Sequence, residues 1–170
     1  MTDRPRAERP AMSAYGVDTP DWEALPWEWA ATRLAANRNF WVVTVSGGGR
    51  PHALPVWGVW DDADLRFAFS CAPGSRKARN LDENPRAVVM VDDTVECISI
   101  EGTAEPVAPG ERAELWIARY LAKYQPLEPE LDGDFLRQNA IYELTPDRAF
   151  AVVERPDEFA ARATRWVFGA

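Results

Sequence analysis

The chain has 170 residues, of which 46% are hydrophobic and eight are tryptophan, a composition that supports a buried core and excludes a disordered polyelectrolyte. Its formal net charge of −8 argues against general binding to nucleic acid or to an anionic membrane, both of which require a basic surface. No apolar run approaches the length of a membrane span and no signal peptide is recognisable, so we expect a cytoplasmic protein.

The first 25 residues are rich in proline and charge and show no hydrophobic periodicity. This pattern predicts an extended arm over residues 1–25 that is either disordered or laid over another surface. Residues 26–170 are predicted to form one domain. That domain opens with a helix after Pro26, because proline is favoured in the first turn and the next apolar residues share one helical face. These are Trp27, Ala30, Ala31, Leu34 and Ala35.

Five strands are predicted in succession after this helix, because short apolar or alternating runs are separated by turn residues. They cover residues 40–46, 52–60, 65–70, 86–91 and 95–107, with a short helix inserted after Ser75. The fourth run, "RAVVMV", is apolar on both faces and is predicted to be buried on two sides. Such a meander predicts an antiparallel barrel or a strongly coiled sheet, since closure removes exposed strand edges.

The last part of the chain combines helices with further strands. The clearest helix spans residues 109–124, where apolar residues recur at intervals of three and four. A short helix is expected over 131–139, followed by two strands at 140–146 and 148–154. Residues 163–168 are expected to form a last short strand or an arm. The predicted class is mainly β with peripheral helices.

The sequence assigns no catalytic residue and no metal ligand. His52 is the only histidine, so a histidine cluster for a metal is excluded, and we interpret it as a packed or turn-facing side chain. Cys71 and Cys97 have no C-x-x-C spacing and are interpreted as inert thiols. Carboxylate pairs at 61–62 and 92–93 fall in predicted hairpins, where aspartate favours turns. An enzyme of this composition would take its reactive group from a cofactor.

The helix after Ser75 carries its charges in the unfavourable order. Arg76 and Lys77 follow the predicted cap Ser75, although the helix dipole favours acids at this end. A bound phosphate explains the order, because free N–H groups and the dipole already attract an anion and the two cations add to that attraction. The alternative is a solvated helix in which Arg79 and Glu83 form an i, i+4 pair.

The stretch "GRPHALPVWGVW…LRFAFSCAPGSRKARNLDENPRAVVMV" resembles the pyridoxamine-phosphate-oxidase-like split β-barrel superfamily of flavoproteins. Members run through three strands, an S-R-K-x-x-x-L-x-x-N-P helix and another strand. The resemblance covers residues 27–107 well, and the residues that match the helix motif are Ser75, Arg76, Lys77, Leu81, Asn84 and Pro85. It implies a six-stranded antiparallel split β-barrel that forms a homodimer, with cofactor sites at the subunit interface.

The resemblance also implies which residues bind the cofactor. Residues 75–77 hold its phosphate, and the strand through residue 57 lies along its tricyclic ring and offers backbone groups to the polar ring edge. Ser70 ends the third strand beside the ribityl chain. The implied cofactor-binding residues are Leu54, Pro55, Val56, Trp57, Ser70, Ser75, Arg76, Lys77 and Asn80.

The motifs favour one branch of this superfamily. The A-R-M-V-L-L-K pattern of the vitamin B6 oxidases is replaced by residues 53–58, and their C-terminal R-L-x-P signature is absent, so pyridoxine oxidation is not expected. "PHALPVWGVW", "GSRKARNL" and the terminal "ATRW" are similar to the deazaflavin-dependent reductases of the B group. These use coenzyme F420, a deazaflavin with a phosphate, a lactyl group and a glutamate tail. Arg50 and Arg79 are candidate partners of that anionic tail.

The implied reaction is hydride transfer from reduced F420 to a small electron-poor substrate such as an enone, a quinone or a tetrapyrrole. Trp57, Tyr120 and Trp166 are candidates to line the substrate face, although ordinary packing is favoured for Tyr120 at its helical spacing. Two alternatives stay open: an oxidoreductase of the same fold that binds FMN, and a non-catalytic carrier of F420, flavin or haem.

Overall fold

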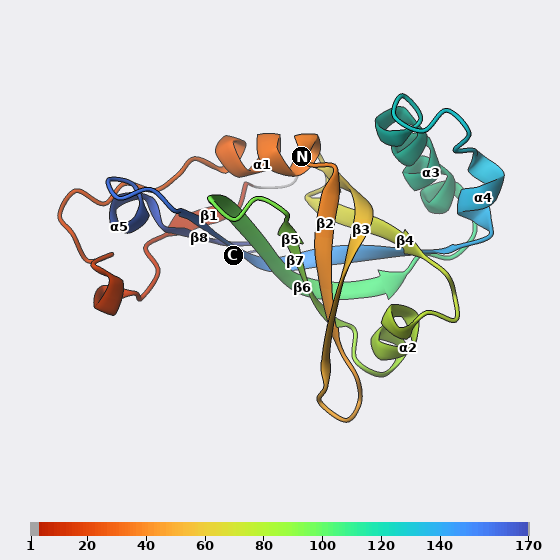
Figure 1. The fold of residues 1–170 in the computed structure, drawn as a ribbon, viewed down its shortest axis with the longest axis horizontal. Helices are drawn as coiled ribbons and strands as arrows, with labels where there is room; N and C mark the ends of the chain where they lie inside the picture. The colour runs from red at the N-terminus through yellow and green to blue at the C-terminus, as the bar shows by residue number, and fades with distance from the viewer. Residues whose placement is uncertain (1–3, 170) are drawn as a thin grey trace.

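Six strands close into an antiparallel barrel in the computed structural model, which describes residues 4–169 (Figure 1). The barrel strands are β2 (Asn39–Val45), β3 (Pro51–Asp61), β4 (Arg66–Cys71), β5 (Arg86–Val91), β6 (Glu96–Pro106) and β7 (Ala140–Val153). They pair in the order β7-β4-β3-β2-β5-β6, and a further pairing of β6 with β7 closes the ring. The mainly β class and the six-stranded antiparallel barrel are therefore confirmed.

Two short strands extend the sheet beyond the barrel. Strand β8 (Thr164–Val167) pairs with the second half of β7, and β1 (Arg6–Glu8) pairs with β8. The predicted N-terminal arm thus lies on its own chain, because β1 is hydrogen-bonded and both Val17 and Leu25 are buried. A 3-10 turn spans Ser13–Tyr15 within this arm.

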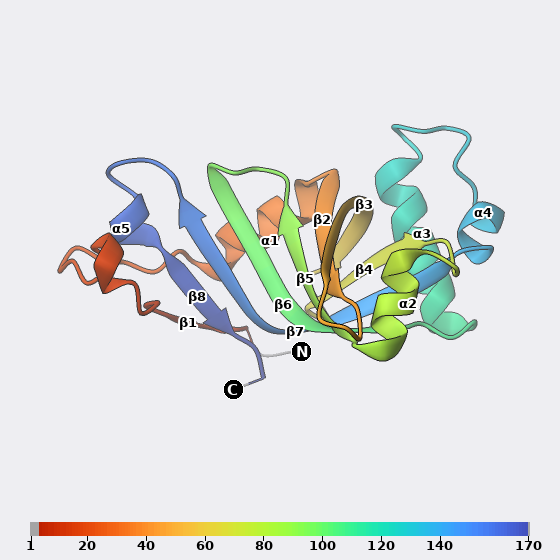
Figure 2. The same cartoon turned by 60° about the horizontal axis from the view of Figure 1, so that its bottom comes forward.

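Helices lie around the barrel. Helix α1 (Trp27–Ala36) contributes its apolar face to the main core, and α5 (Phe159–Arg162) precedes β8. Helix α2 (Arg76–Glu83) crosses from β4 to β5 and lies beside the projecting β2–β3 hairpin (Figure 2). Helix α3 (Glu111–Tyr124) and α4 (Gly133–Arg137) lie together at the same end of the molecule as α2. No helix within residues 4–169 is long and apolar enough to cross a membrane.

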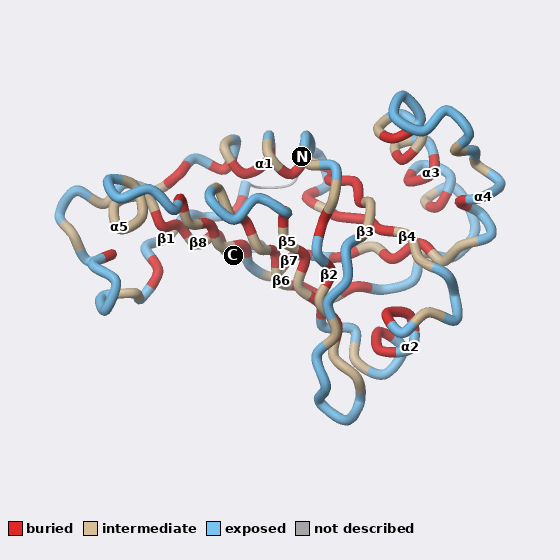
Figure 3. The backbone as a smooth tube through the Cα atoms, in the orientation of Figure 1, coloured by how far each residue is buried: buried red, intermediate tan, exposed pale blue. Residues whose placement is uncertain are grey.

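The core has two parts. The larger part fills the barrel and includes α1, and it contains Phe40, Phe67, Ile98 and Leu144. The smaller part packs Trp116 and Tyr120 of α3 against the outer side of β3, β4 and β7. In Figure 3 red stretches alternate with tan and pale-blue ones along the barrel strands, and red also marks parts of α1, α2 and α3, whereas the tip of the β2–β3 hairpin is exposed.

Two expectations about strands are wrong. Residues 140–146 and 148–154 do not form separate strands, because β7 runs continuously through them and absorbs an irregularity where Gly102 of β6 pairs with Pro146. Gly102 fits there because an added Cβ would lie 2.1 Å from the Thr145 carbonyl oxygen. The fourth predicted strand, β5, is not buried on both sides within one chain, since Val88 and Met90 are only half-buried.

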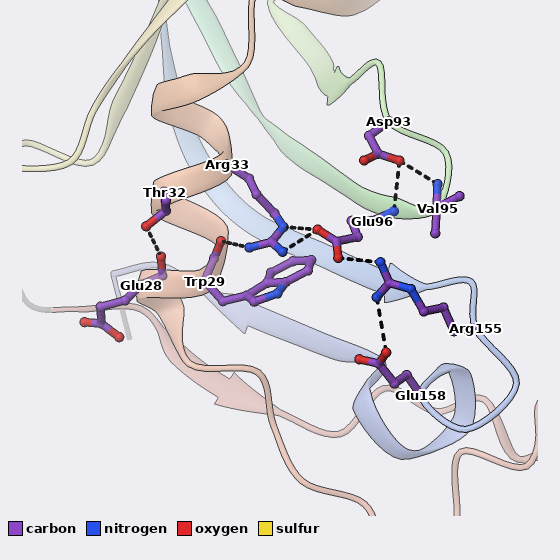
Figure 4. Close-up of polar contacts among 9 residues, drawn as sticks. All are labelled: Glu28, Trp29, Thr32, Arg33, Asp93, Val95, Glu96, Arg155 and Glu158. Carbon is purple, nitrogen blue, oxygen red and sulfur yellow. Dashed lines mark hydrogen bonds and ion pairs between the residues drawn. The ribbon is translucent and has the colours of Figure 1, made fainter.

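A polar cluster fixes α1 to the end of the barrel opposite α2 (Figure 4). The Glu96 carboxylate of β6 accepts hydrogen bonds from Arg33 of α1 and from Arg155, which also pairs with Glu158. The Arg33 guanidinium lies 3.9 Å from the ring centroid of Trp29. The two arginines lower the pKa of Glu96 and keep it ionised. The Asp93 carboxylate meanwhile accepts from two backbone N–H groups, which confirms its predicted role in a turn.

Candidate cofactor-binding site

Strand β3 changes its neighbour at Gly58. Residues 51–57 pair only with β2, whereas Gly58–Asp61 pair with β4. The outer edge of the first segment therefore has no neighbouring strand among residues 4–169. Backbone N–H and C=O groups at such an edge need partners from water or a ligand. The split between β3 and β4 makes this edge a candidate ligand-binding surface.

The point of separation is fixed by α3. Gly58 lies directly on the Phe67 ring, and an added Cβ would lie 2.1 Å from Phe67 Cζ. The Tyr124 hydroxyl accepts from the Gly58 N–H at 2.8 Å, and it lies within hydrogen-bond distance of the carbonyl oxygens of Gly58 (2.8 Å) and Arg38 (2.7 Å). Tyr120 Oη donates to the Trp57 carbonyl at 2.7 Å. Two tyrosine side chains of α3 therefore supply hydrogen-bond partners to the backbone of residues 57–58.

Lys123 completes this contact between α3 and β3. Its Nζ donates to the Gly58 carbonyl oxygen at 2.9 Å and lies 5.0 Å from the Phe40 ring centroid. Burial lowers the pKa of Lys123 to about 8 and raises the pKa of Tyr124 to about 12. Burial also raises the pKa of Tyr120 well above its ordinary value. Both tyrosine hydroxyls are therefore neutral at physiological pH and act as hydrogen-bonding groups rather than bases.

The N-terminus of α2 is cationic. Ser75 Oγ accepts from the Ala78 N–H at 3.2 Å as the predicted cap, and the first turn contains no acid. Lys77 is only 8% exposed, yet its ammonium forms no hydrogen bond or ion pair with any other residue of 4–169. Asn80 donates to the Thr44 hydroxyl at 2.9 Å in a buried contact that fixes α2 on β2. The stem of Lys77 is packed on the protein and its ammonium, which has no partner among these residues, stays accessible, so it is a candidate anion ligand.

The alternative of a solvated helix with an Arg79–Glu83 pair is wrong. The Arg79 guanidinium donates instead to the Gly74 carbonyl, so its charge lies over the turn that precedes α2. The Glu83 carboxylate accepts from the backbone N–H of Gly47 at 2.8 Å. The positive end of the helix is therefore not neutralised by the acids that close it.

A cleft of about 340 Å³ lies between α2 and the start of β3. Arg50, Arg76 and Arg79 contribute cations to its wall, and Glu83 contributes the one carboxylate among the residues that line it. His52 also lines the cleft, and its Nδ1 is buried without a hydrogen-bond partner. Burial and, to a lesser extent, the nearby Arg76 and Lys77 lower the pKa of His52.

A second cleft of about 280 Å³ lies at the other end of the unpaired β3 edge. Trp57, Ser70 and Tyr120 line it, together with Cys71, Ala72, Leu131, Phe135, Leu136 and Asn139. Trp57 stacks on Tyr124 at 4.7 Å between ring centroids, which fixes its indole on this wall. Both cysteines are free thiols.

The predicted cofactor-binding residues lie at the two clefts, on the strand edge between them and at the start of α2. Arg76 and Asn80 line the first cleft, and Trp57 and Ser70 line the second. Strand β3 carries the exposed Leu54 and Pro55 and the half-buried Val56 between the two clefts. Ser75 is the N-cap of α2 and Lys77 lies in its first turn, and neither residue lines a cleft. Trp166 does not belong to the site: it is fully buried and packs on Trp27 at 5.5 Å.

The residues at α2 fit a phosphate group. Arg50, Arg76 and Arg79 line the cleft. Lys77 lies in the first turn of α2, and the cap and first turn contain no carboxylate. The donors are the guanidinium, ammonium and N–H groups that phosphate prefers. Among residues 4–169 no group of three or more histidine, cysteine or acidic side chains is placed to hold a metal ion. The site therefore has a cationic end and an aromatic end, joined by a free strand edge.

Comparison with known proteins agrees with this architecture. The family described as pyridoxamine 5'-phosphate oxidase matches residues 27–153. The barrel and its crossover helix define a protein of the split β-barrel class, and the chain belongs to the pyridoxamine 5'-phosphate oxidase family. No curated protein sequence matches it.

Solved structures share the fold at low sequence identity. A conserved hypothetical protein from Mycobacterium tuberculosis is 19% identical, with a TM-score of 0.64 over 88% of each chain. HutZ, a haem storage protein from Vibrio cholerae, is 19% identical with a TM-score of 0.60, over 76% of this chain and 95% of its own. A protein described as a putative pyridoxamine 5'-phosphate oxidase from Listeria innocua is 15% identical with a TM-score of 0.58, over 73% of this chain and 95% of its own.

Proposed function

We propose that this protein binds coenzyme F420 and transfers a hydride from its reduced form to a small electron-poor substrate of the enone, quinone or tetrapyrrole class. The observation that carries the proposal is the cationic end of α2, where the first turn contains no acid and the accessible Lys77 ammonium has no acidic partner among residues 4–169, although the whole chain is acidic. A phosphate placed there compensates the charge of Lys77 and of the neighbouring arginines.

Each part of the site has a role in this proposal. Ser75, Arg76 and Lys77 hold the phosphate, and Arg50 and Arg79 extend the cationic wall toward the lactyl and glutamate groups. The free edge of β3 at Leu54–Val56 offers backbone N–H and C=O groups to the polar edge of the ring, and Ser70 lies beside the ribityl chain. Trp57 and Tyr120 line the cleft for the substrate and orient it against the ring.

The reduced deazaflavin, when bound, supplies the hydride from its ring carbon. The protein orients the two reactants, and solvent supplies the proton that completes the reduction. Tyr120 and Tyr124 keep their protons because burial raises the pKa of each, and their hydroxyls are engaged with the backbone of residues 57–58. The proposal therefore assigns no catalytic acid or base.

We also propose that two copies associate through the outer face of β2, β3 and β5. Residues directly opposite each other in these strands share this face: Trp41 pairs with Pro55 and with Met90, and Val43 pairs with Val88. Trp41 is 43% exposed within one chain. An exposed sheet face with this many apolar residues is typical of an interface, and a second copy there would place two sites at one subunit boundary.

Absorption spectra of the purified protein with each added cofactor test the proposed cofactor. We expect F420 to bind and to give the deazaflavin band, while FMN would give the two bands of a flavin and haem a Soret band. FMN is the strongest competitor, because it also carries a phosphate that α2 would hold. Tight binding of FMN or haem with none of F420 would overturn the proposal.

Turnover separates an enzyme from a carrier. Oxidation of reduced F420 in the presence of a panel of enones and quinones is expected to depend on the protein and on the acceptor. Binding of F420 without acceptor-dependent oxidation across the panel would instead support the non-catalytic carrier.

A further inference from the structure

The imidazole of His52 lies where α2 approaches the barrel. In the β2–β3 ladder His52 pairs with Thr44, and Thr44 accepts the buried hydrogen bond from Asn80 of α2. His52 therefore lies on the face of β3 that α2 covers, in the wall of the cationic cleft. Its Nδ1 is buried and has no hydrogen-bond partner, which is a costly state for a polar atom.

The charges around His52 are almost all positive. Arg50 precedes it at the start of β3, and α2 contributes Arg76, Lys77 and Arg79. Thr44 of β2 and Ser46, which follows β2, carry no charge, nor does Ala87 of β5, which pairs with Thr44. Glu83 is the single carboxylate in the wall of this cleft, and its oxygen is already bonded to the Gly47 N–H.

These surroundings favour the neutral form of the free imidazole. Burial is the main cause that lowers the pKa of His52, and the charges of Arg76 and Lys77 lower it further. An anion bound between these cations would reverse the electrostatic part of this effect. The imidazolium form would then present N–H donors at both ring nitrogens, one of which lacks a partner in the neutral site.

We propose that binding of a phosphate group in this cleft draws a proton onto His52, so that the only histidine of the chain is a proton-linked ligand of phosphate. The inference rests on the proposed function, because it takes the phosphate to lie at the N-terminus of α2. It goes beyond that proposal by assigning a role to a residue outside the motif and by giving the site a pH dependence.

The direction in which phosphate affinity changes with pH follows from the lowered pKa of His52 in the protein without a bound anion. His52 must gain a proton when the anion binds, so the affinity for phosphate rises as the pH falls between the His52 pKa values of the bound and the free protein. Each unit by which binding raises the pKa strengthens binding at low pH by about tenfold. A doubly charged phosphate monoester should raise it more than a singly charged phosphodiester, because more negative charge opposes the arginines.

Nuclear magnetic resonance of the imidazole tests the coupling directly, because one histidine gives one unambiguous ring signal. The His52 ring would be titrated from about pH 5 to 8.5 alone, with inorganic phosphate and with dimethyl phosphate. Dimethyl phosphate keeps a constant charge over this range, so any change in its affinity with pH belongs to the protein. We expect both anions to raise the His52 pKa and inorganic phosphate to raise it more.

Backbone amide signals of Arg76 and Lys77 report binding independently of His52. If these amides shift on addition of phosphate while the His52 pKa stays unchanged, the inference is overturned and the proposed cofactor site stands. If neither the amides nor the ring respond to either anion, the phosphate site is absent and the inference fails together with the proposed function.

Two variants test the inference a second time, through the pH dependence of their affinity for dimethyl phosphate. His52→Gln keeps a hydrogen-bonding side chain that does not titrate, and it should bind dimethyl phosphate with an affinity that no longer depends on pH. Arg148→Gln is the matched control: Arg148 lies on β7, pairs with Glu101 and does not line the cleft, so this variant should keep the wild-type pH dependence. Equal pH dependence in wild type and His52→Gln would contradict the inference.

Discussion

At the scale of single residues, Lys77 places a packed side-chain stem and an accessible ammonium, unpaired within the described residues, at the start of α2. It is almost fully buried on α2, and among residues 4–169 its ammonium has no carboxylate to compensate it. Replacing Lys77 with methionine keeps the packing of the side-chain stem and removes the charge. We expect Lys77→Met to fold with unchanged or higher stability and to lose about tenfold or more in F420 affinity, since a hydrogen bond to a charged group contributes about 1.5–3 kcal/mol.

Fluorescence titration with F420 and urea unfolding measure the two effects separately. Lys77→Glu should weaken binding further, because it places a negative charge where the phosphate is proposed to lie. Unchanged affinity in both variants would show that the cationic end of α2 is not the phosphate site.

The residues of the anion-binding end were only partly predictable from the sequence. The order of charges after Ser75 indicated a phosphate, and the structure places Arg50, Arg76 and Arg79 around one cleft. The position of His52 in the wall of this cleft was not predicted, because a lone histidine in a strand has no spacing that distinguishes a ligand from a packed side chain. Only the pairing of β3 with β2 brings it to the face covered by α2.

At the scale of elements, the separation of β3 from β4 depends on Gly58. An added Cβ would meet the fully buried Phe67 ring at 2.1 Å, and the Gly58 backbone is held by Tyr124. We expect Gly58→Ala to lower the free energy of unfolding by about 1–3 kcal/mol, as overpacking of a core does. Urea unfolding measures the change.

Gly74 provides the control for this substitution. An added Cβ at Gly74 has no neighbour within 4 Å, so Gly74→Ala should change the unfolding free energy by no more than about 0.5 kcal/mol. Equal stability of the two variants would mean that the contact between Gly58 and Phe67 does not restrain β3.

Lys123 makes the contact between α3 and β3 sensitive to pH. Its folded-state pKa of about 8 is below its ordinary value of 10.5, so between these values the unfolded chain holds a proton that the folded chain has lost. Stability must rise with pH in this window, with a slope of at most about 1.4 kcal/mol per pH unit. Tyr120 and Tyr124 have raised pKa values and act in the opposite direction only above about pH 10.

The comparison of wild type with Lys123→Met isolates this effect, because every other titrating group contributes to both proteins. We expect the difference in unfolding free energy, wild type minus variant, to increase from about pH 8 to 9.5 in urea unfolding experiments. A difference that stays constant with pH would show that the Lys123 amine keeps its ordinary pKa in the folded protein.

The elements themselves were largely predictable, and the exceptions have physical reasons. Alternation and turn residues located β2 to β6 correctly, since both signals are local. Pro146 and Asp147 suggested a break between two strands, but β7 passes through them because the irregularity opposite Gly102 accommodates the register shift. The pairing of β1 with β8 joins residues from the two ends of the chain, and no local pattern encodes such a contact.

At the scale of the whole molecule, the barrel explains how distant segments form one site. Helix α2 connects β4 to β5, which are separated by β3 and β2 in the sheet, so the crossover carries the cationic helix to the free edge of β3. Helix α3 lies farther along the same edge and closes the aromatic cleft. The succession of strands predicted an antiparallel barrel or a strongly coiled sheet, and the family resemblance predicted six strands. The order of the strands was not predicted, because hydrophobic periodicity identifies strands and not their neighbours.

The outer sheet face gives the prediction that concerns the assembly. The sequence "RAVVMV" predicted burial on both sides of β5, whereas one chain buries only one side and leaves Met90 beside the exposed Trp41. A second copy on this face resolves the difference. We expect the protein to sediment as a dimer, with twice the 19.1 kDa mass of one chain, and Trp41→Lys to sediment as a monomer because a charge replaces the central aromatic contact.

Leu127→Lys is the matched control, since Leu127 is 51% exposed and follows α3, outside the three strands that form this face. This variant should remain a dimer. If the cofactor site lies between the two copies, Trp41→Lys should also lose F420 affinity, while Leu127→Lys should keep it. A wild-type protein that sediments as a monomer at micromolar concentration, or a Trp41→Lys variant that remains a dimer, would contradict the proposed interface, because the apolar face would then be stable in water or the contact would lie elsewhere.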